Sequence, residues 1–388
     1  MPPKKRDWSW RSRATRGIVY QAIAVAAIAA AVWFLAHNTI ENMRVRGIQS
    51  GFGFLTQPAG FDIGESVFAY ESSDPYWKAF LVGLSNTLRV AIVGIVLTTL
   101  LGTLLGIGRL SRNFLLRSAC TAYVELFRNI PVLLQMLMWY FVLNEWLPPV
   151  SDALHPIPGV FLSKSGMSFP VPVWQPGYLV ALTGVFAGAI GAWLYRHRAR
   201  TAFERTGIAR PMVWPPLLIL VACALVGWIA GGAPTALELP ERNDLNVAGG
   251  GAVTPEFLAV TIGLTVYTAA FVAEIVRSGI QSVAWGQTEA ASALGLTRGQ
   301  ALKLVLLPQA LRVIIPPLTN QYLNLTKNSS LAVAVGYPDL VSISNTTLNQ
   351  TGRAVECIAV IMAVYLTLSL VTAGLMNWYN ARSAIRER

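Results

Sequence analysis

Charged residues are scarce in this chain of 388 amino acids, where they make up 13% of the sequence against 54% hydrophobic residues. A soluble domain carries about 25% charged residues, because water must solvate its surface. This composition, with a mean hydropathy of +0.51, excludes an ordinary soluble protein and indicates an integral membrane protein. At roughly 20 residues for each span, the length allows about eight transmembrane helices and their loops.

Cysteine and histidine are also rare. The three cysteines lie far apart in or beside apolar stretches, which indicates neither a disulfide framework nor a metal site. The three histidines are not clustered, and we predict no metal centre. The sequence has no G-x-x-x-x-G-K-[ST] phosphate loop and no nucleophile–base arrangement, so we expect a non-enzyme that binds no cofactor and hydrolyses no ATP itself.

The net charge of +11 comes from lysines and arginines that gather beside hydrophobic runs. Such residues set the orientation of a protein in the membrane, since cytoplasmic loops carry the excess of positive charge. We therefore expect lipid and not nucleic acid as a partner, with both termini in the cytoplasm. The residues on which this orientation rests are Lys4, Lys5, Arg6, Arg11, Arg13 and Arg16, the loop arginines Arg196, Arg198, Arg200, Arg205 and Arg210, and the terminal Arg382, Arg386 and Arg388.

Apolar runs predict an all-α, polytopic fold with about eight spans, an even number that places both termini on one side. The expected spans are residues 18–36, 80–107, 123–147, 177–195, 213–230, 257–280, one between 313 and 335, and 355–378. The first run is longer than the apolar core of a signal peptide, about 7–15 residues, so we predict a retained helix, although the sequence does not decide its retention. The limits of the seventh span stay open because Pro316, Pro317 and Lys327 interrupt it.

The segment Gly286–Pro308 is too polar to enter lipid and should lie in the cytoplasm between two spans. We expect a short helix around Glu289, a break at Gly295, which favours turn geometry, and a second short helix from Arg298 to Leu306. Two short helices joined by a glycine turn can project from the membrane and contact another protein.

This segment resembles the EAA loop of ATP-binding-cassette importer permeases, with Val305 where the family more often has isoleucine. The matching positions are Glu289, Ala290, Ala291, Gly295, Val305, Leu307 and Pro308. Further segments are similar to polar amino-acid importer permeases of the histidine/glutamine type: Gly83–Leu88, Glu125–Pro131, Ala273–Arg277 and Lys327–Leu331. The additional first helix and an inserted helix pair look like the longer permease of broad-specificity L-amino-acid importers.

The resemblance implies four segments around a permease core of about five helices. They are residues 1–76 with the first helix and a periplasmic loop, 77–147 with the first part of the core, 148–256 with inserted periplasmic loops and the extra helix pair, and 257–388 with the second part of the core and the coupling loop 281–312.

The resemblance also implies the partners and the location. A periplasmic amino-acid-binding protein delivers the substrate, two permease subunits form the pathway in the bacterial inner membrane, and separate ATPase subunits bind ATP and Mg²⁺. The EAA loop couples ATP-driven closure of the ATPases to the membrane helices. The long insert favours a second permease of different sequence. Which amino acids are carried, and whether the permease pair is homo- or heterodimeric, stay open.

Ionisable residues inside spans are costly and are candidate functional groups. Glu274 and Arg277 are three residues apart on one helical face, so mutual pairing is favoured over substrate contact. Lys327, beside Asn328 and Ser329, could meet a substrate carboxylate or could extend to the membrane interface. The main alternative function is a secondary transporter that works without an ATPase; Pro316 and Pro317 could break a helix as in such proteins, but no internal repeat is visible.

Overall fold

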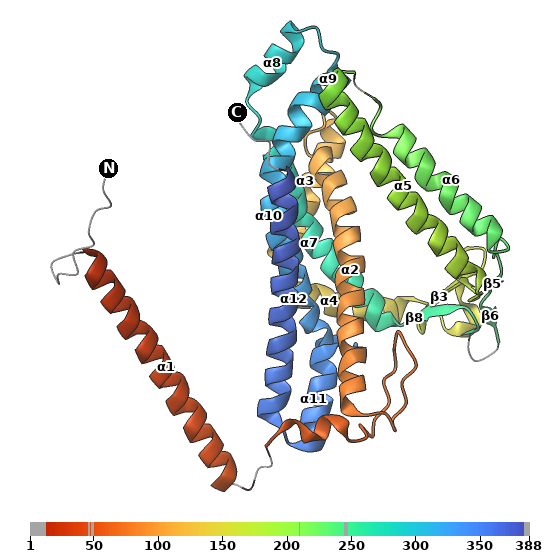
Figure 1. Ribbon diagram of the computed structural model, residues 1–388. Coiled ribbons are helices and arrows are strands. Elements are labelled where there is room, and N and C mark those ends of the chain that lie inside the picture. Colours follow the sequence, from red (N-terminus) through yellow and green to blue (C-terminus); the bar gives the residue numbers. More distant parts are fainter. Residues whose placement is uncertain (1–12, 46, 48–49, 209, 244–246, 384–388) are drawn as a thin grey trace. The chain divides into compact units, whose positions relative to one another are not determined.

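The computed structural model describes residues 13–45, 47, 50–208, 210–243 and 247–383 (Figure 1). Several residues on which the predicted orientation rests, Lys4, Lys5, Arg6, Arg11, Arg386 and Arg388, lie outside the described residues. The chain forms two compact units: unit 1 comprises Met1–Met136 and Val260–Arg388, and unit 2 comprises Leu137–Ala259. The stretch 148–256, which the sequence marks as an insert, falls within unit 2.

Helices dominate the structure. They are α1 (Arg13–Val45), α2 (Tyr76–Gly108), α3 (Phe114–Asn129), α4 (Val132–Trp146), α5 (Gly177–Thr206), α6 (Trp214–Ala230), α7 (Pro255–Gln281), α8 (Trp285–Ala293), α9 (Arg298–Ala301), α10 (Leu307–Asn328), α11 (Leu340–Thr351) and α12 (Ala354–Ser383). Short 3₁₀ segments cover Phe52–Thr56, Val150–Asp152 and Ser329–Val335, and a π-helical turn covers Leu302–Leu306.

Six helical segments in the described chain are long and apolar enough to cross a membrane: α1, α2, α5, α7, the continuous run Arg298–Val335 and α12. The bent pair α3 and α4 makes a seventh if it forms one span, and α6 is a shorter apolar helix of 17 residues. The predicted all-α membrane fold is confirmed, and the helices accommodate about eight spans.

The third predicted span is not one straight helix starting at Tyr123. Helix α3 begins at Phe114, where the Asn113 side chain accepts hydrogen bonds from the backbone N–H groups of Leu115 and Leu116. The chain then breaks before α4 and turns by 106°. Pro131 explains the break, because it lacks an N–H and forces the preceding Ile130 into its observed extended conformation.

The expected interruption of the seventh span also does not occur. Helix α10 continues through Pro316 and Pro317, and it joins α9 through the π-helical turn, so this helical run begins at Arg298. Packing against α7 supports the helix, since Ala310 and Ile314 are buried beside Val272 and Val276. Neighbouring helices of this kind allow prolines inside membrane helices.

Unit 2 contains strands that the sequence analysis assigned to loops. Strands β1 (Leu154–Ile157), β2 (Val160–Ser163), β3 (Gly166–Phe169) and β8 (Gly251–Val253) form an antiparallel sheet in the order β1-β2-β3-β8. Two-residue strands pair β4 (Val171–Pro172) with β5 (Leu237–Glu238), and β6 (Glu241–Arg242) with β7 (Val247–Ala248). Helices α5 and α6 lie antiparallel in the same unit, in close contact where Gly184 meets Gly227.

A row of small residues brings α2 against its neighbours in unit 1. Gly94, Thr98, Gly102 and Gly106 repeat every four residues along one face of α2. A Cβ atom at Gly102 would lie 2.6 Å from the Cβ of Val272, so the two helices approach closely there. Small residues at this spacing let membrane helices pack backbone to backbone, where van der Waals contact supplies the attraction.

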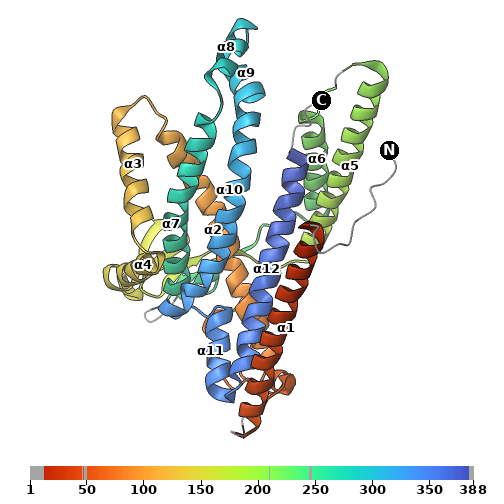
Figure 2. The same cartoon turned by 90° about the vertical axis from the view of Figure 1, so that its left-hand side faces the viewer.

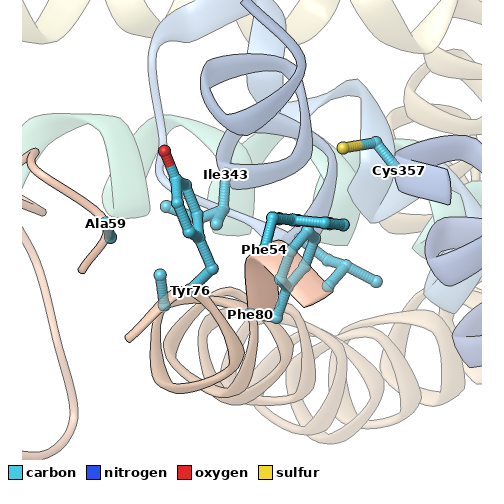
Figure 3. Close-up of a cluster of buried hydrophobic side chains, with 8 residues drawn as sticks. Phe54, Ala59, Tyr76, Phe80, Ile343 and Cys357 are labelled. Atoms are coloured by element: carbon cyan, nitrogen blue, oxygen red, sulfur yellow. The ribbon is translucent and has the colours of Figure 1, made fainter. Parts of the chain in front are cut away.

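Aromatic side chains fill a second core at the start of α2 (Figure 3). Phe54 packs edge-on against Tyr76 with 5.6 Å between ring centroids, and both lie beside Phe80 and Ile343. The Cys357 side chain is buried in the same cluster. This core ties the segment after α1 to α2, α11 and α12.

Candidate functional site

The predicted EAA loop forms α8 and the turn that follows it. Helix α8 projects at one end of unit 1, beyond the ends of α7 and α10 (Figure 2). It ends at Ala293, and the predicted break follows at Gly295, whose φ of +73° lies in the left-handed region that glycine tolerates. The N–H of Gly295 donates to Ser292 O and the N–H of Leu296 donates to Ala291 O, so the turn satisfies the last carbonyls of α8.

The second predicted helix begins at Arg298, as expected, with a side-chain cap. Thr297 and Gln300 form a reciprocal capping box, in which each side chain accepts from the other residue's backbone N–H. The helix does not stop at Leu306, however, but continues into α10. Leu307 and Pro308 therefore lie in the first turn of α10, directly after the π-helical turn Leu302–Leu306.

Large apolar side chains are exposed on this otherwise polar projection. Leu294 is 80% exposed and Trp285 is 74% exposed, and the Trp285 ring N–H donates to Glu289 Oε1 at 3.0 Å. Ala290 faces solvent, whereas Ala291 is buried. The Trp285 and Leu294 side chains lie at opposite ends of α8, and both are accessible to a protein that docks on this projection.

Glu274 and Arg277 pair with each other, as their spacing predicted. Arg277 Nε donates to Glu274 Oε2 at 3.2 Å, and Arg277 Nη2 donates to Glu274 Oε1. The structure adds a partner that the sequence analysis missed, because Arg109 Nη1 of the α2 end also donates to Glu274 Oε2. The only signal for it in the sequence was its place at the end of a predicted span. Whether Glu274 or Arg277 also contacts substrate stays a prediction.

Lys327 lies at the other end of α10 with an exposed side chain, and no hydrogen bond or ion pair of its ammonium group occurs among the described residues. Asn328 is half-buried, and the buried Ser329 hydroxyl donates to Thr326 O at 2.7 Å. Helices α7 and α10 run antiparallel, with Gly279 opposite Ile314. At 1.5 Å rise for each residue, Lys327 is on the order of 12 Å along the axis from Glu274. The candidate residues therefore do not form one site.

A buried polar cluster near the start of α2 was not anticipated as a unit. The Asn86 amide donates to Glu65 O at 2.8 Å and to Pro338 O at 2.9 Å. The Leu340 N–H donates to Thr87 Oγ1, while Asp339 caps α11 by accepting from Ser342 N–H at 2.8 Å. These bonds explain why the Gly83–Leu88 segment needs polar residues inside a span: they join α2 to the chain before α11.

Asp339 is itself unusual. It lies between the candidate spans and is 1% exposed. Burial raises its pKa to about 7, since removal from water disfavours the charged carboxylate. Burial also raises the pKa of the neighbouring Tyr337 above its ordinary value. Neither pKa shift could be predicted from the sequence, because both depend on what packs around the two side chains.

Comparisons with known proteins agree on the class of this chain. It is 43% identical to the general L-amino acid transport system permease protein AapQ of Rhizobium johnstonii, over 98% of this chain and 96% of that protein. It is 45% identical to the putative amino-acid ABC transporter permease protein YhdX of Escherichia coli, over 99% and 98% of the two chains. It is 39% identical to the glutamate/glutamine/aspartate/asparagine transport system permease protein BztB of Rhodobacter capsulatus, over 96% and 95%.

A family model supports the same conclusion independently of single relatives. The model for the inner membrane component of binding-protein-dependent transport systems matches residues 94–385. The matched range includes the projecting α8 and the ion pair of Glu274 with Arg277 on α7. On this match, and on relatives that align along nearly the whole chain, the protein belongs to the family of binding-protein-dependent transport system inner membrane components.

Proposed function

We propose that this chain is a membrane subunit of an ATP-driven importer that takes up L-amino acids from the periplasm. The observation that carries this proposal is the projection formed by α8 and its glycine turn, with Leu294 and Trp285 exposed. An exposed apolar surface on a polar, membrane-external segment requires a protein partner. The EAA pattern on this surface fits a separate ATPase subunit, which supplies the ATP and Mg²⁺ that this chain is not expected to bind.

The proposed orientation follows from the distribution of charge. Helix α5 carries its arginines at the C-terminal end, and Arg196, Arg198, Arg200 and Arg205 are exposed there. Positive residues beside a span favour the cytoplasmic side. In this orientation the termini and α8 lie in the cytoplasm of a bacterial inner-membrane protein, and the periplasmic amino-acid-binding protein approaches the opposite face.

L-amino acids are the proposed substrates because the aligned relatives are named as amino-acid permeases. The second permease subunit is proposed to be a different chain, since unit 2 makes this one unlike the shorter members of the family.

The proposal is tested by purifying the tagged chain from native membranes in mild detergent and identifying bound proteins by mass spectrometry. We expect an ATPase with a phosphate loop and a second permease of different sequence. Leu294→Ser should release the ATPase, whereas Leu239→Ser, at a leucine of unit 2 that is also more than half exposed, should retain it. A chain that purifies alone and transports amino acids in liposomes without ATP would replace this proposal with a secondary transporter.

A further inference from the structure

A surface pocket of about 520 Å³, open to solvent and called the cavity below, lies in unit 1 between the C-terminal ends of α2 and α7 and the first half of α3. This volume is within the range of about 300–1,000 Å³ that small-molecule sites occupy. Its lining residues are Arg109, Arg117, Ser118, Thr121, Ala122 and Arg277. Three guanidinium groups thus line one space: Arg109 directly after α2, Arg117 of α3 and Arg277 of α7.

The positive charge of the cavity is incompletely neutralised. Glu274 is the carboxylate that binds both Arg109 and Arg277, and a single negative charge balances only one of them. Arg117 has no ion pair within the part of the chain that the structure describes. The Arg109 side chain is only 10% exposed, so water solvates its charge poorly.

The polar side chains that line the cavity offer donors rather than negatively charged acceptors. Each guanidinium has five N–H donors, and Arg109 uses one of them on Glu274. The hydroxyls of Ser118 and Thr121 lie three residues apart on α3, one helical turn from each other, and neither is engaged in a hydrogen bond among the described residues. No carboxylate lines the space, so the ammonium group of an amino acid would find no anionic partner there.

We propose that this cavity binds a phosphate group, provided either by the headgroup of an anionic lipid or by a free phosphate compound. Arginine forks bind phosphate oxygens in pairs, and hydroxyl groups complete such sites. The cavity is at the same end of α7 as the connection to α8, since Arg277 lies four residues before the helix ends at Gln281. The site is independent of the transport function proposed above, and only its cytoplasmic location rests on that proposal.

The binding test uses the full-length protein with the subunits that purify with it. In detergent, the thermal stability is titrated with inorganic phosphate against chloride at equal ionic strength. In a parallel arm, nanodiscs of phosphatidylcholine are compared with nanodiscs that also contain phosphatidylglycerol, and retained lipid is measured by native mass spectrometry. Arg117→Gln should weaken phosphate or lipid binding by about tenfold or more, since hydrogen bonds to charged groups are the strong ones.

Arg112→Gln is the matched control, because Arg112 is exposed in the same α2–α3 connection but does not line the cavity. Stabilisation by inorganic phosphate that Arg117→Gln alone removes identifies a free phosphate compound, whereas an effect confined to phosphatidylglycerol identifies the lipid headgroup. Equal losses in both variants, or no binding in either arm, would overturn the proposal. Both readouts are judged by the difference between Arg117→Gln and Arg112→Gln in the same preparation and require no transport, so failure of the proposed function is recognised separately.

Discussion

Substitution of Gly102 by alanine tests whether close packing of α2 on α7 holds unit 1 together. The new Cβ atom would lie 2.6 Å from both Cβ and Cγ1 of Val272 and 3.0 Å from Ala269 O. Carbon atoms in favourable contact are about 3.5–4.0 Å apart, so the helices must separate by roughly 1 Å. The backbone carbonyl of Ala269 cannot rotate out of the way as the end of a flexible side chain would.

The expected cost follows from the contacts that this separation weakens. Each pair of heavy atoms in contact contributes about 0.1–0.2 kcal/mol of van der Waals attraction, and a gap of about 0.5–1 Å removes a quarter to a half of it. Summed over a few tens of atom pairs between α2 and α7, the loss is about 1–3 kcal/mol. That range agrees with the usual cost of an overpacked core. Gly102→Val should cost more, because its two additional methyl groups enter the same space.

The measurement is the fraction of purified protein that stays monodisperse after heating, compared at one temperature for all variants. Gly374→Ala in α12 is the control, since a Cβ at that helical position meets nothing within 4 Å. It reports the gain in helix propensity, about 1 kcal/mol in water, without a clash. If Gly102→Ala survives heating as well as Gly374→Ala, the inferred close approach of α2 and α7 is wrong.

Three further outcomes are expected. Gly295→Pro should uncouple ATP hydrolysis from transport or release the ATPase, because proline cannot adopt the φ of +73°. The control Gly299→Ala, in the same segment, should leave transport rates unchanged. Normal transport by Gly295→Pro would refute the coupling role. Lys327→Ala should impair amino-acid uptake while the ATPase still co-purifies, and unchanged uptake kinetics would remove Lys327 from the substrate pathway. Burial raises the pKa of Asp339 to about 7 from 3.8, so its contribution to stability is complete below about pH 4 and is lost progressively as the pH rises through about 7. Asp339→Asn, which retains the helix cap, should flatten the decline in thermal stability between about pH 4 and 7.

Much of the segment Gly286–Pro308 follows from local rules. The break after α8 at Gly295 and the start of the next helix at Arg298 were both predicted, since each depends on the conformational preference of one or two residues. The pairing of Glu274 with Arg277 was predictable for the same reason, because their spacing places both on one helical face. None of these three predictions required knowledge of what packs against the helices.

The sequence by itself thus determined the membrane class, the helical content and the two short helices with their glycine turn, because hydropathy, helix periodicity and a local motif are properties of short segments. Tertiary structure alone decided that Arg109 joins Glu274, that Asp339 is buried, and that Arg117 shares a cavity with Arg277. It also decided that α10 continues through its two prolines, because packing against α7 supports the helix there. These outcomes depend on groups distant in the sequence, whose packing sets the solvation and the contacts that each residue experiences.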